Sequence, residues 1–451
     1  MNNTSNLIQL MNLDNLDNSS ADHRLLSNYV GKQGEIRTAF MEGISCDRSH
    51  WRTDICFVRG DVRMKTKSIQ LHSQDRHRSH VVEKVKPYPR KWETAVMENV
   101  DEVTIESLYA PSVSAASTDG IMNCNVNYST PAVIFSTGGY SGNVYHDFND
   151  GLIPLYITTH HLQGEVVFLI LEYHEWWLKK YGQVLQQLSH YPVVDLSNDY
   201  STVHCFREAI VGLKIHDELS INPKLLADHV GSIKDFRQML QQAFIPSDDR
   251  QLSNYASADN GRRVPQFGSS KKPKLVLIAR KGSRAILNQA KLIALAKQLG
   301  FQVKVIIPTD TTKLERIFRL LNSCDVMMGV HGAAMTHLLF MRPGTVFIQI
   351  IPLGTDYPAL TYYGEPAKKL GLDYIEYKIT AQESSLSQKY NEHDRVLSDP
   401  QIIASQGWPS LKKYYLQGQS VRLFMPRIKL VLQKALQKIK LERNKVKISN
   451  Q

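Results

Sequence analysis

The feature that most constrains the fold is a regular alternation of short apolar runs with helical patterns between residues 274 and 351. Each run is six residues long and mostly apolar at its centre, as in strands that are buried on both faces of a parallel sheet. The runs occupy residues 274–279, 302–307, 325–330 and 346–351, and the helical patterns occupy residues 285–299, 312–323 and 333–341. The sequence therefore predicts an α/β fold in which helices cover both faces of the sheet.

The first half of the chain alternates in the same way, but less regularly. Strands are expected within residues 132–136, 166–171 and 202–213, and helices within residues 143–155, 176–188 and 235–243. A polar stretch, residues 247–272, contains Gly, Pro and a run of Ser and Lys, which is typical of a linker between domains.

These patterns divide the chain of 451 residues into six parts. They are a disordered lead-in (1–40), an N-terminal α/β domain (41–250), a linker (251–273), a C-terminal α/β domain (274–405), a closing helical segment (406–441) and a basic tail (442–451). The closing segment contains an amphipathic helix expected at residues 426–440. Ligands of open α/β sheets bind beyond the carboxyl ends of the strands, so the loops there are where chemistry is expected.

The net charge of +11 is concentrated in two segments. Residues 48–93 hold 12 Lys and Arg against 5 Asp and Glu, and residues 427–447 hold 8 against 1. Such basic segments can bind nucleic acid or an anionic membrane surface, or they can be solvated surface without a binding role. No recognised nucleic-acid module accompanies the charge, so nucleic-acid binding is the most distant alternative. The first segment is expected to belong to the folded N-terminal domain and the second to be a solvated end.

The residues alone say little about the cellular compartment of the protein. The longest apolar runs fall well short of the ~20 residues that a transmembrane helix needs, so we expect a soluble chain or one that lacks an upstream anchor. Five cysteines occur, and no spacing among them suggests zinc. Cys46 and Cys56 flank a short polar stretch and can form a local disulfide, although two buried thiols fit the sequence equally well.

Two loops at predicted carboxyl ends carry candidate ligand-binding residues. Arg280 and Arg284 follow the first run, directly before an expected helix, so cations and free N–H groups converge as in a phosphate site; a solvated turn is the plainer alternative. The second loop, residues 329–337, contains His331, Gly332, Ala333 and His337. Its small residues allow a ligand to approach closely, or they simply pack the helix on the sheet. Neither loop is a P-loop or a G-x-G-x-x-G motif, so ATPase and dehydrogenase interpretations have no support.

A third candidate lies in the N-terminal domain, within residues 138–150. If a helix starts near Asn143, His146 and Asp150 lie four residues apart on one face. Either group could deprotonate a hydroxyl near neutral pH, and the alternative is a local His–Asp pair in a capped helix. No Asp-x-Asp occurs in the chain, so no obvious carboxylate pair is present to hold Mg²⁺ or Mn²⁺ on a diphosphate.

Taken together, these residues resemble glycosyltransferase family 61, in particular the plant branch that decorates xylan. The resemblance runs from about Cys46 to Lys440, and its motifs are far more specific together than any one alone. The matching stretches are residues 46–47 with 52–56, 60–63, 87–91, 139–156, 279–288 and 329–340, with Trp408, Tyr414 and Tyr415 near the end.

The resemblance implies a GT-B architecture, in which two Rossmann-like domains face a central cleft, and a metal-independent, inverting transfer from a UDP-sugar without a cofactor. Carried onto matching positions, Arg280 and Arg284 hold the diphosphate, and the residues of the 329–337 loop border the nucleotide. Asn143 and Tyr145 belong to the motif that faces donor and acceptor. The general base is Asp150 or His146, and the resemblance leaves the choice open.

The function implied is transfer of a pentose, xylose or arabinofuranose, from a UDP-sugar to the β-1,4-xylan backbone of plant cell walls, without nucleic acid as a partner. The acceptor is xylan or a xylo-oligosaccharide, and other xylan-synthesis enzymes in the Golgi are expected partners. A nearer alternative keeps the enzyme class but changes the acceptor to a protein N-glycan or the donated sugar to N-acetylglucosamine. Family members are anchored in the Golgi membrane with a lumenal catalytic part, so we expect the Golgi lumen, although this sequence shows no anchor.

Overall fold

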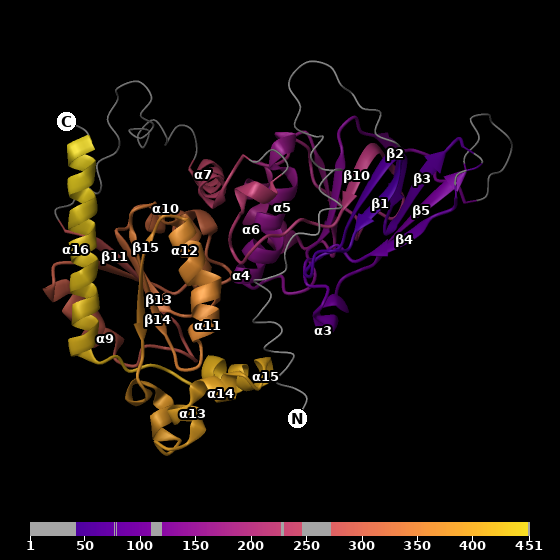
Figure 1. Cartoon of the computed structure of the whole chain (residues 1–451). Helices are drawn as coiled ribbons and strands as arrows, with labels where there is room; N and C mark the ends of the chain where they lie inside the picture. Colours follow the sequence, from indigo (N-terminus) through magenta and orange to yellow (C-terminus); the bar gives the residue numbers. More distant parts are fainter. Residues whose placement is uncertain are drawn as a thin grey trace.

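The computed structural model describes residues 42–75, 77, 79–109, 120–226, 230–245 and 272–449 (Figure 1). We call residues 42–245 the first half and residues 272–449 the second half. The expected lead-in and nearly all of the expected linker lie outside the described residues, so these two predictions stay untested. Each half is built around one sheet with helices packed on it, and the chain is therefore an α/β protein.

The sheet of the second half is entirely parallel, as the sequence predicts. Its strand order is β12-β11-β13-β14-β15, and every neighbouring pair is parallel. The strands are β11 (Lys274–Ile278), β12 (Gln302–Ile306), β13 (Val326–Val330), β14 (Val346–Ile351) and β15 (Asp373–Lys378). The edge strand β15 was not predicted, because its sequence alternates polar and apolar residues and lacks an apolar run.

Helices cover both faces of this sheet because successive strand residues point to opposite sides. Leu275 and Leu277 of β11 face the helices α9 (Gln289–Gln298) and α16 (Met425–Ser449). Val276 and Ile278 face the other side, where α10 (Leu314–Asn322) packs. The prediction of a parallel sheet covered on both faces is confirmed.

The first half contains a mixed, ten-stranded sheet, whose main order is β4-β5-β3-β2-β10-β7-β8-β9. The expected strands appear as β7 (Ala132–Ser136), β8 (Val167–Leu171) and β10 (His204–Val211), which are parallel to one another. The expected helices correspond to α6 (Glu175–Leu185), α7 (Ile233–Phe244) and the helical stretch after Asn143. The remaining strands are β1 (Gly43–Asp47), β2 (Ile55–Lys65), β3 (Ser68–Ser73), β4 (Val82–Val85), β5 (Val103–Tyr109), β6 (Val126–Asn127) and β9 (Val194–Asp195).

The strands β1 to β5 were missed because none of them is a long apolar run, and charged residues interrupt β2, β4 and β5. In β2 the residues Arg59, Asp61, Arg63 and Lys65 alternate with buried apolar ones, so one face of the strand is polar. β2 pairs antiparallel with β10, and this half is therefore not a simple doubly wound sheet. Three strands of this sheet, β2, β3 and β4, lie within the basic segment 48–93, so this segment belongs to the folded first half.

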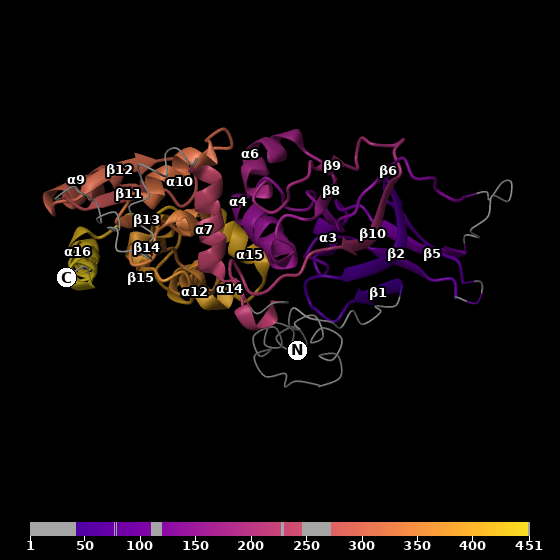
Figure 2. The ribbon, with the colours of Figure 1, turned by 90° about the horizontal axis from the view of Figure 1, so that it is seen from above.

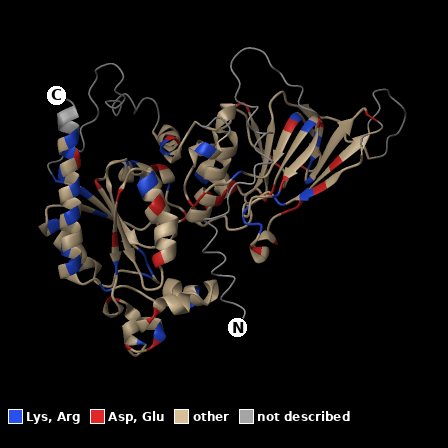
Figure 3. Cartoon of the chain, in the orientation of Figure 1, with Lys and Arg blue, Asp and Glu red and all other residues tan. Residues whose placement is uncertain are grey.

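The C-terminal helix α16 is longer than expected. It continues through Ser449, so the expected basic tail from residue 442 is helical as far as the structure describes it. Ile428 and Leu432 on one face are buried against the sheet, while lysines follow the rest of the helix (Figure 3). Arg443, further along the helix, forms an ion pair with Asp325, whose carboxylate lies 3.3 Å from the guanidinium group. Within the described ranges, no helix is long and apolar enough to cross a membrane.

One apolar cluster joins the two halves. Helix α7 lies between them (Figure 2), and it contacts α6 of the first half and α10 of the second. Phe236 of α7 packs on Phe148 of the first half, and Phe148 packs in turn on Phe340 of the second. Phe244 of α7 also contacts Phe318 of α10. We call these five phenylalanines the aromatic cluster.

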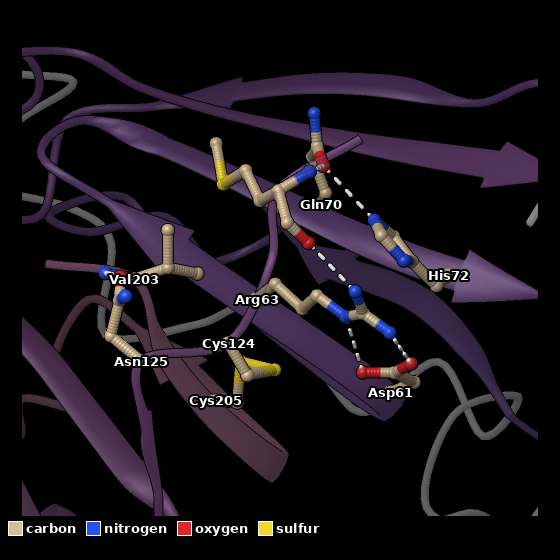
Figure 4. The surroundings of a disulfide bond; sticks show 9 residues. Asp61, Arg63, Gln70, His72, Cys124, Asn125, Val203 and Cys205 are labelled. Atoms are coloured by element: carbon tan, nitrogen blue, oxygen red, sulfur yellow. Dashed lines mark hydrogen bonds and ion pairs between the residues drawn. A yellow bond between two sulfur atoms is a disulfide. The ribbon is translucent and has the colours of Figure 1, made fainter. Parts of the chain in front are cut away.

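Two disulfides stabilise the first half. Cys46 and Cys56 are directly opposite each other on β1 and β2 and are bonded, so the local disulfide is the alternative that the structure supports. A second bond, which was not predicted, joins Cys124 to Cys205 of β10 (Figure 4). Beside it, Arg63 binds both the carboxylate of Asp61 and the carbonyl oxygen of Met122. Among the described residues, Cys324 is the free cysteine, and it is buried.

Loss of either disulfide is expected to lower the free energy of unfolding, and the longer loop is expected to matter more. The separations are 10 residues for Cys46–Cys56 and 81 for Cys124–Cys205. Loop-closure entropy then gives about 3 kcal/mol for the first and about 4.5 kcal/mol for the second. Urea unfolding of the Cys46→Ser/Cys56→Ser and Cys124→Ser/Cys205→Ser variants measures both. Equal losses, or none on chemical reduction of the wild type, would contradict this expectation.

Candidate active site

The predicted dyad in the first half lies on an irregular helical stretch. Asn143 caps it by accepting a hydrogen bond from the Tyr145 N–H at 3.0 Å. A short helix, α4 (Val144–His146), leads into a π-helical turn (Asp147–Leu152) and then into α5 (Ile153–Thr159). π-Helical turns are rare and frequent at functional sites. The Nδ1–H of His146 donates to the Asp150 carboxylate at 2.6 Å, so the expected contact between these two residues is confirmed.

The carboxylate of Asp150 is buried and accepts several hydrogen bonds. Arg90 donates two hydrogen bonds to it, at 2.9 and 2.8 Å, and Arg52 donates one at 3.2 Å. Asn149 donates a further bond at 2.8 Å. Burial by itself raises the pKa of Asp150, but the bond from His146 and the charge of Arg90 outweigh it, so the pKa lies well below its usual range. An ionised carboxylate held in this way positions other groups and is a poor proton acceptor.

His146 is the member of the dyad that can meet a ligand. Its side chain keeps 16% of its surface exposed, whereas that of Asp150 keeps none. Because Asp150 engages Nδ1, the second ring nitrogen, Nε2, is the one that can accept a proton. The ring also stacks on Tyr140 with their centroids 4.2 Å apart. The arrangement resembles the acid–base pairs in which a carboxylate orients a histidine.

The glycines before the dyad allow the backbone to approach Tyr88 closely. Gly139 has a φ of +60°, and a Cβ there would lie 2.6 Å from the Tyr88 ring. The Tyr88 hydroxyl accepts a hydrogen bond from the Tyr140 N–H at 3.2 Å. The loop is thereby fixed so that Tyr140 lies against His146, and its hydroxyl donates to Glu93 at 2.6 Å.

Arg52 and Arg90 were not predicted as site residues, although both lie in stretches that carry the family resemblance. Arg52 is fully buried and also binds Glu218 at 3.1 Å, and the Tyr145 hydroxyl donates to the same carboxylate. Arg90 binds Glu93 at 3.1 Å. Sequence spacing cannot reveal the contacts of these arginines with Asp150 and Glu218, because they join residues 60 to 166 positions apart.

In the second half, Arg280 and Arg284 converge over one glycine. A Cβ on Gly332 would lie 2.1 Å from Nη1 of Arg280 and 3.1 Å from Nη1 of Arg284. Arg284 donates to the carbonyl oxygen of His331 at 3.0 Å, and the Arg280 Nε–H donates to that of Ser283 at 3.3 Å. The two loops singled out from the sequence therefore meet, and only glycine at position 332 leaves room for both guanidinium groups.

The helix expected at residues 285–299 is present as α9, but its expected start directly after Arg284 is wrong, because α9 begins only at Gln289. Before it, residues 284–288 form turns around a single bridge between Ile286 and Val421. The Arg284 N–H donates to the carbonyl oxygen of Gln419, and the Leu287 N–H donates to that of Val421. The helix N-terminus is thus displaced from the arginines. Any anion bound there is met chiefly by the two guanidinium groups.

No carboxylate among the described residues forms an ion pair with Arg280 or Arg284. Burial, and then the charge of Arg280, lowers the pKa of Arg284 to about 10. Burial also lowers the pKa of Arg280. Two adjacent, partly buried cations without a protein counter-charge favour an anionic ligand, with which each can form charge-assisted hydrogen bonds.

His331 and His337 are both buried. Nδ1 of His331 is 3.1 Å from Nε2 of Gln349, and Nδ1–H of His337 donates to the carbonyl oxygen of Ala334 at 2.8 Å. His337 packs on Phe340 of the aromatic cluster. The prediction that these histidines and Ala333 border a nucleotide stays a prediction, and His337 also has a clear packing role.

Acid is expected to destabilise the protein through these two histidines. Burial, followed by the charge of Arg284, lowers the pKa of His331 to about 3, and burial lowers that of His337 to about 4. In the unfolded chain both titrate near 6.5, so the unfolded state binds more protons between pH ~6.5 and ~4. Stability is therefore complete above that range and falls as the pH drops through it. Urea unfolding at pH 7.5 and 5 measures how much the free energy of unfolding falls between the two pH values. This fall should be smaller in the His337→Gln variant. A fall equal to that of the wild type would show that His337 is not a cause.

Aromatic rings connect the two sets of predicted residues across the halves. Tyr145, next to His146, lies with its ring centroid 5.1 Å from that of Tyr362 and 5.9 Å from that of Tyr363. Tyr363 lies 5.4 Å from His331, whose carbonyl oxygen binds Arg284. The π-helical turn that holds Tyr362 and Tyr363 (Leu360–Gly364) was not predicted. The histidine dyad and the arginine pair thus belong to one region at the junction of the halves.

The sequence of this chain is similar to those of known proteins over most of its length. The family description Glycosyltransferase 61 matches residues 183–348. The xylan glycosyltransferase MUCI21 of Arabidopsis thaliana is 49% identical over 395 residues, which are 87% of this chain and 78% of that protein. The chain belongs to glycosyltransferase family 61.

Two further relatives come from Oryza sativa subsp. japonica. The α-1,3-arabinosyltransferase XAT3 is 36% identical over 87% of this chain and 64% of its own length. The β-1,2-xylosyltransferase XYXT1 is 34% identical over 87% of this chain and 84% of its own length. The protein is therefore a glycosyltransferase, which transfers a sugar to a glycan acceptor, and it groups with plant family 61 enzymes of xylan synthesis.

Proposed function

We propose that this family 61 enzyme transfers a pentose, xylose or arabinofuranose, from a UDP-sugar to the β-1,4-xylan backbone with inversion at the anomeric carbon. One observation carries the chemistry: ring contacts from Tyr145 through Tyr363 to His331 link the His146–Asp150 pair of one half to the Arg280–Arg284 pair of the other. The names of the relatives, which include xylan, arabinosyl and xylosyl transferases, support the pentose and the acceptor.

In this proposal His146 is the general base. Its Nε2 takes the proton of a xylosyl hydroxyl, and that oxygen attacks the anomeric carbon as the bond to the diphosphate breaks. Asp150 holds the ring through Nδ1 and stabilises the imidazolium that forms. Transfer from an α-linked UDP-xylose then yields a β-xyloside, and the proton passes from His146 to solvent.

Arg280 and Arg284 are proposed to receive the departing diphosphate. Negative charge grows on the leaving oxygen, and two preorganised guanidinium groups stabilise it most where water is excluded. The proposal assigns this role to the arginines and requires neither a metal ion nor a cofactor. Tyr145 and Asn143 position the dyad toward donor and acceptor, and the loop with His331, Gly332 and Ala333 borders the nucleotide.

The proposed architecture is GT-B, with an acceptor domain at residues 41–250, a nucleotide-sugar domain at residues 274–405, a cleft between them, and α16 as the closing amphipathic helix. The parallel strands in both halves support it, although the first half adds antiparallel strands. We also propose the Golgi lumen, in association with other xylan-synthesis enzymes. The two disulfides support an oxidising compartment.

A donor–acceptor assay tests this function. Purified protein is incubated with UDP-xylose or UDP-arabinofuranose and xylo-oligosaccharides, with and without EDTA, and the linkage of the product is determined. We expect pentosyl transfer that EDTA does not reduce. Transfer only to an N-glycan would replace xylan as the acceptor in the proposal, and transfer to neither acceptor would refute the proposed function. A strong loss of activity with EDTA would refute the metal-free mechanism.

A further inference from the structure

Two tryptophans at the surface of the first half form an exposed aromatic pair. Trp51 keeps 54% of its surface exposed and Trp92 keeps 52%. Their ring centroids are 5.9 Å apart with an interplanar angle of 26°. Large aromatic side chains are usually more buried than this, and an exposed cluster of them commonly marks a binding surface.

The pair is held in place by its supporting loops. Trp51 lies in the loop between β1 and β2, which the Cys46–Cys56 disulfide closes, and Trp92 lies just before the short helix α3 (Thr94–Met97). The Lys91 N–H donates to the carbonyl oxygen of Arg52 at 3.1 Å, so the two loops are hydrogen-bonded directly beside the rings. A platform fixed before the ligand arrives loses little conformational freedom on binding.

Both tryptophans adjoin residues that lead to the proposed base. Arg52, next to Trp51, binds Asp150, and its guanidinium carbon lies 5.4 Å from the centroid of the Trp51 ring. Glu93, next to Trp92, binds the hydroxyl of Tyr140, whose ring stacks on His146. Each tryptophan is thus connected to His146 through short chains of contacts. The tryptophan pair is therefore linked by direct contacts to the residues that surround His146.

We propose that Trp51 and Trp92 form a binding subsite for the acceptor glycan, and that they bind it by stacking on its pyranose rings. A β-1,4-linked xylosyl unit has all its hydroxyl groups equatorial, so the axial C–H groups form apolar faces that can stack on an aromatic ring. The subsite holds acceptor units other than the one that reacts, so it selects acceptors of sufficient length. This inference rests on the proposed function, since it takes the xylan chain as the acceptor.

Kinetics with acceptors of two lengths test the subsite. In the Trp51→Ala and Trp92→Ala variants, the KM for xylohexaose is expected to rise about tenfold while kcat changes less than twofold, the effect of losing one aromatic contact. The KM for xylobiose should change less, and the Kd for UDP should stay the same. Trp51→Phe should restore much of the loss. Tyr200→Ala, which removes a 67% exposed aromatic ring of the same half, is the matched control.

Binding without turnover gives a second measurement. Xylohexaose should change the intrinsic tryptophan fluorescence of the wild type, and the change should be lost in the Trp51→Ala/Trp92→Ala variant. If this variant is folded, as judged by its melting temperature, and keeps the wild-type KM and fluorescence change, the subsite is refuted while the proposed function stands. If the wild type transfers to no xylan-type acceptor, the proposed function fails, and the subsite fails with it.

Discussion

Replacing His146 with alanine is expected to lower kcat for pentosyl transfer by about 10²–10⁴-fold, the usual contribution of a positioned general base. Asp150 cannot take over the role. Its carboxylate already accepts bonds from Arg52, Arg90 and Asn149, and its pKa lies well below the usual range. The Kd for UDP should change little, because the arginines proposed to bind the diphosphate belong to the other half.

Steady-state kinetics and UDP titration of His146→Ala measure both quantities. The matched control is His190→Ala, which removes the histidine of another histidine–carboxylate pair, formed with Glu165 at 3.2 Å on the exposed surface. That variant should retain wild-type turnover. If a folded His146→Ala protein keeps more than a third of the wild-type kcat, the assignment of His146 as the base is wrong.

Arg280→Ala is expected to reduce kcat/KM by about 10²–10³-fold, because a preorganised donor to the charge that develops in the transition state is lost. UDP binding should weaken as well, and Arg280→Lys should recover only part of the activity, since an ammonium group cannot reproduce the planar guanidinium fork. The same substitution should not lower the melting temperature of the free enzyme. It removes a cation that lies against Arg284 without a counter-charge, and so relieves repulsion.

Lys281→Ala provides the control for charge alone, since Lys281 is an exposed cation in the same loop. It should leave both turnover and UDP affinity near the wild-type values. A large loss of stability in Arg280→Ala together with unchanged UDP affinity would show that Arg280 is a structural residue and would remove it from the donor site.

The second half was predictable from sequence because its strands are continuous apolar runs, and four of its five strands were found. In the first half, the strands before β7 were missed. Charged residues such as Arg59 and Asp61 occupy one face of β2, so the apolar run that marks a buried strand is absent. Where a helix begins also depends on tertiary contacts, as the pairing of residues 284–287 with 419–421 shows.

The candidate site was predictable only in part. Spacing on a helix brought His146 and Asp150 together, and the carboxyl ends of neighbouring parallel strands placed Arg280 and Arg284 beside Gly332. The partners of Asp150 come from distant loops, and no local pattern marks a buried arginine as the counter-ion of a given carboxylate. The sequence therefore offered two candidates for the base, and only the surroundings of Asp150 separate them.

The aromatic cluster also determines how the two halves can move. Phe236 and Phe244 of α7 pack against both halves, so separating the halves at this position would expose large apolar rings to water. The cluster thus opposes separation of the two halves at α7, because the buried rings of both halves would lose contact with one another.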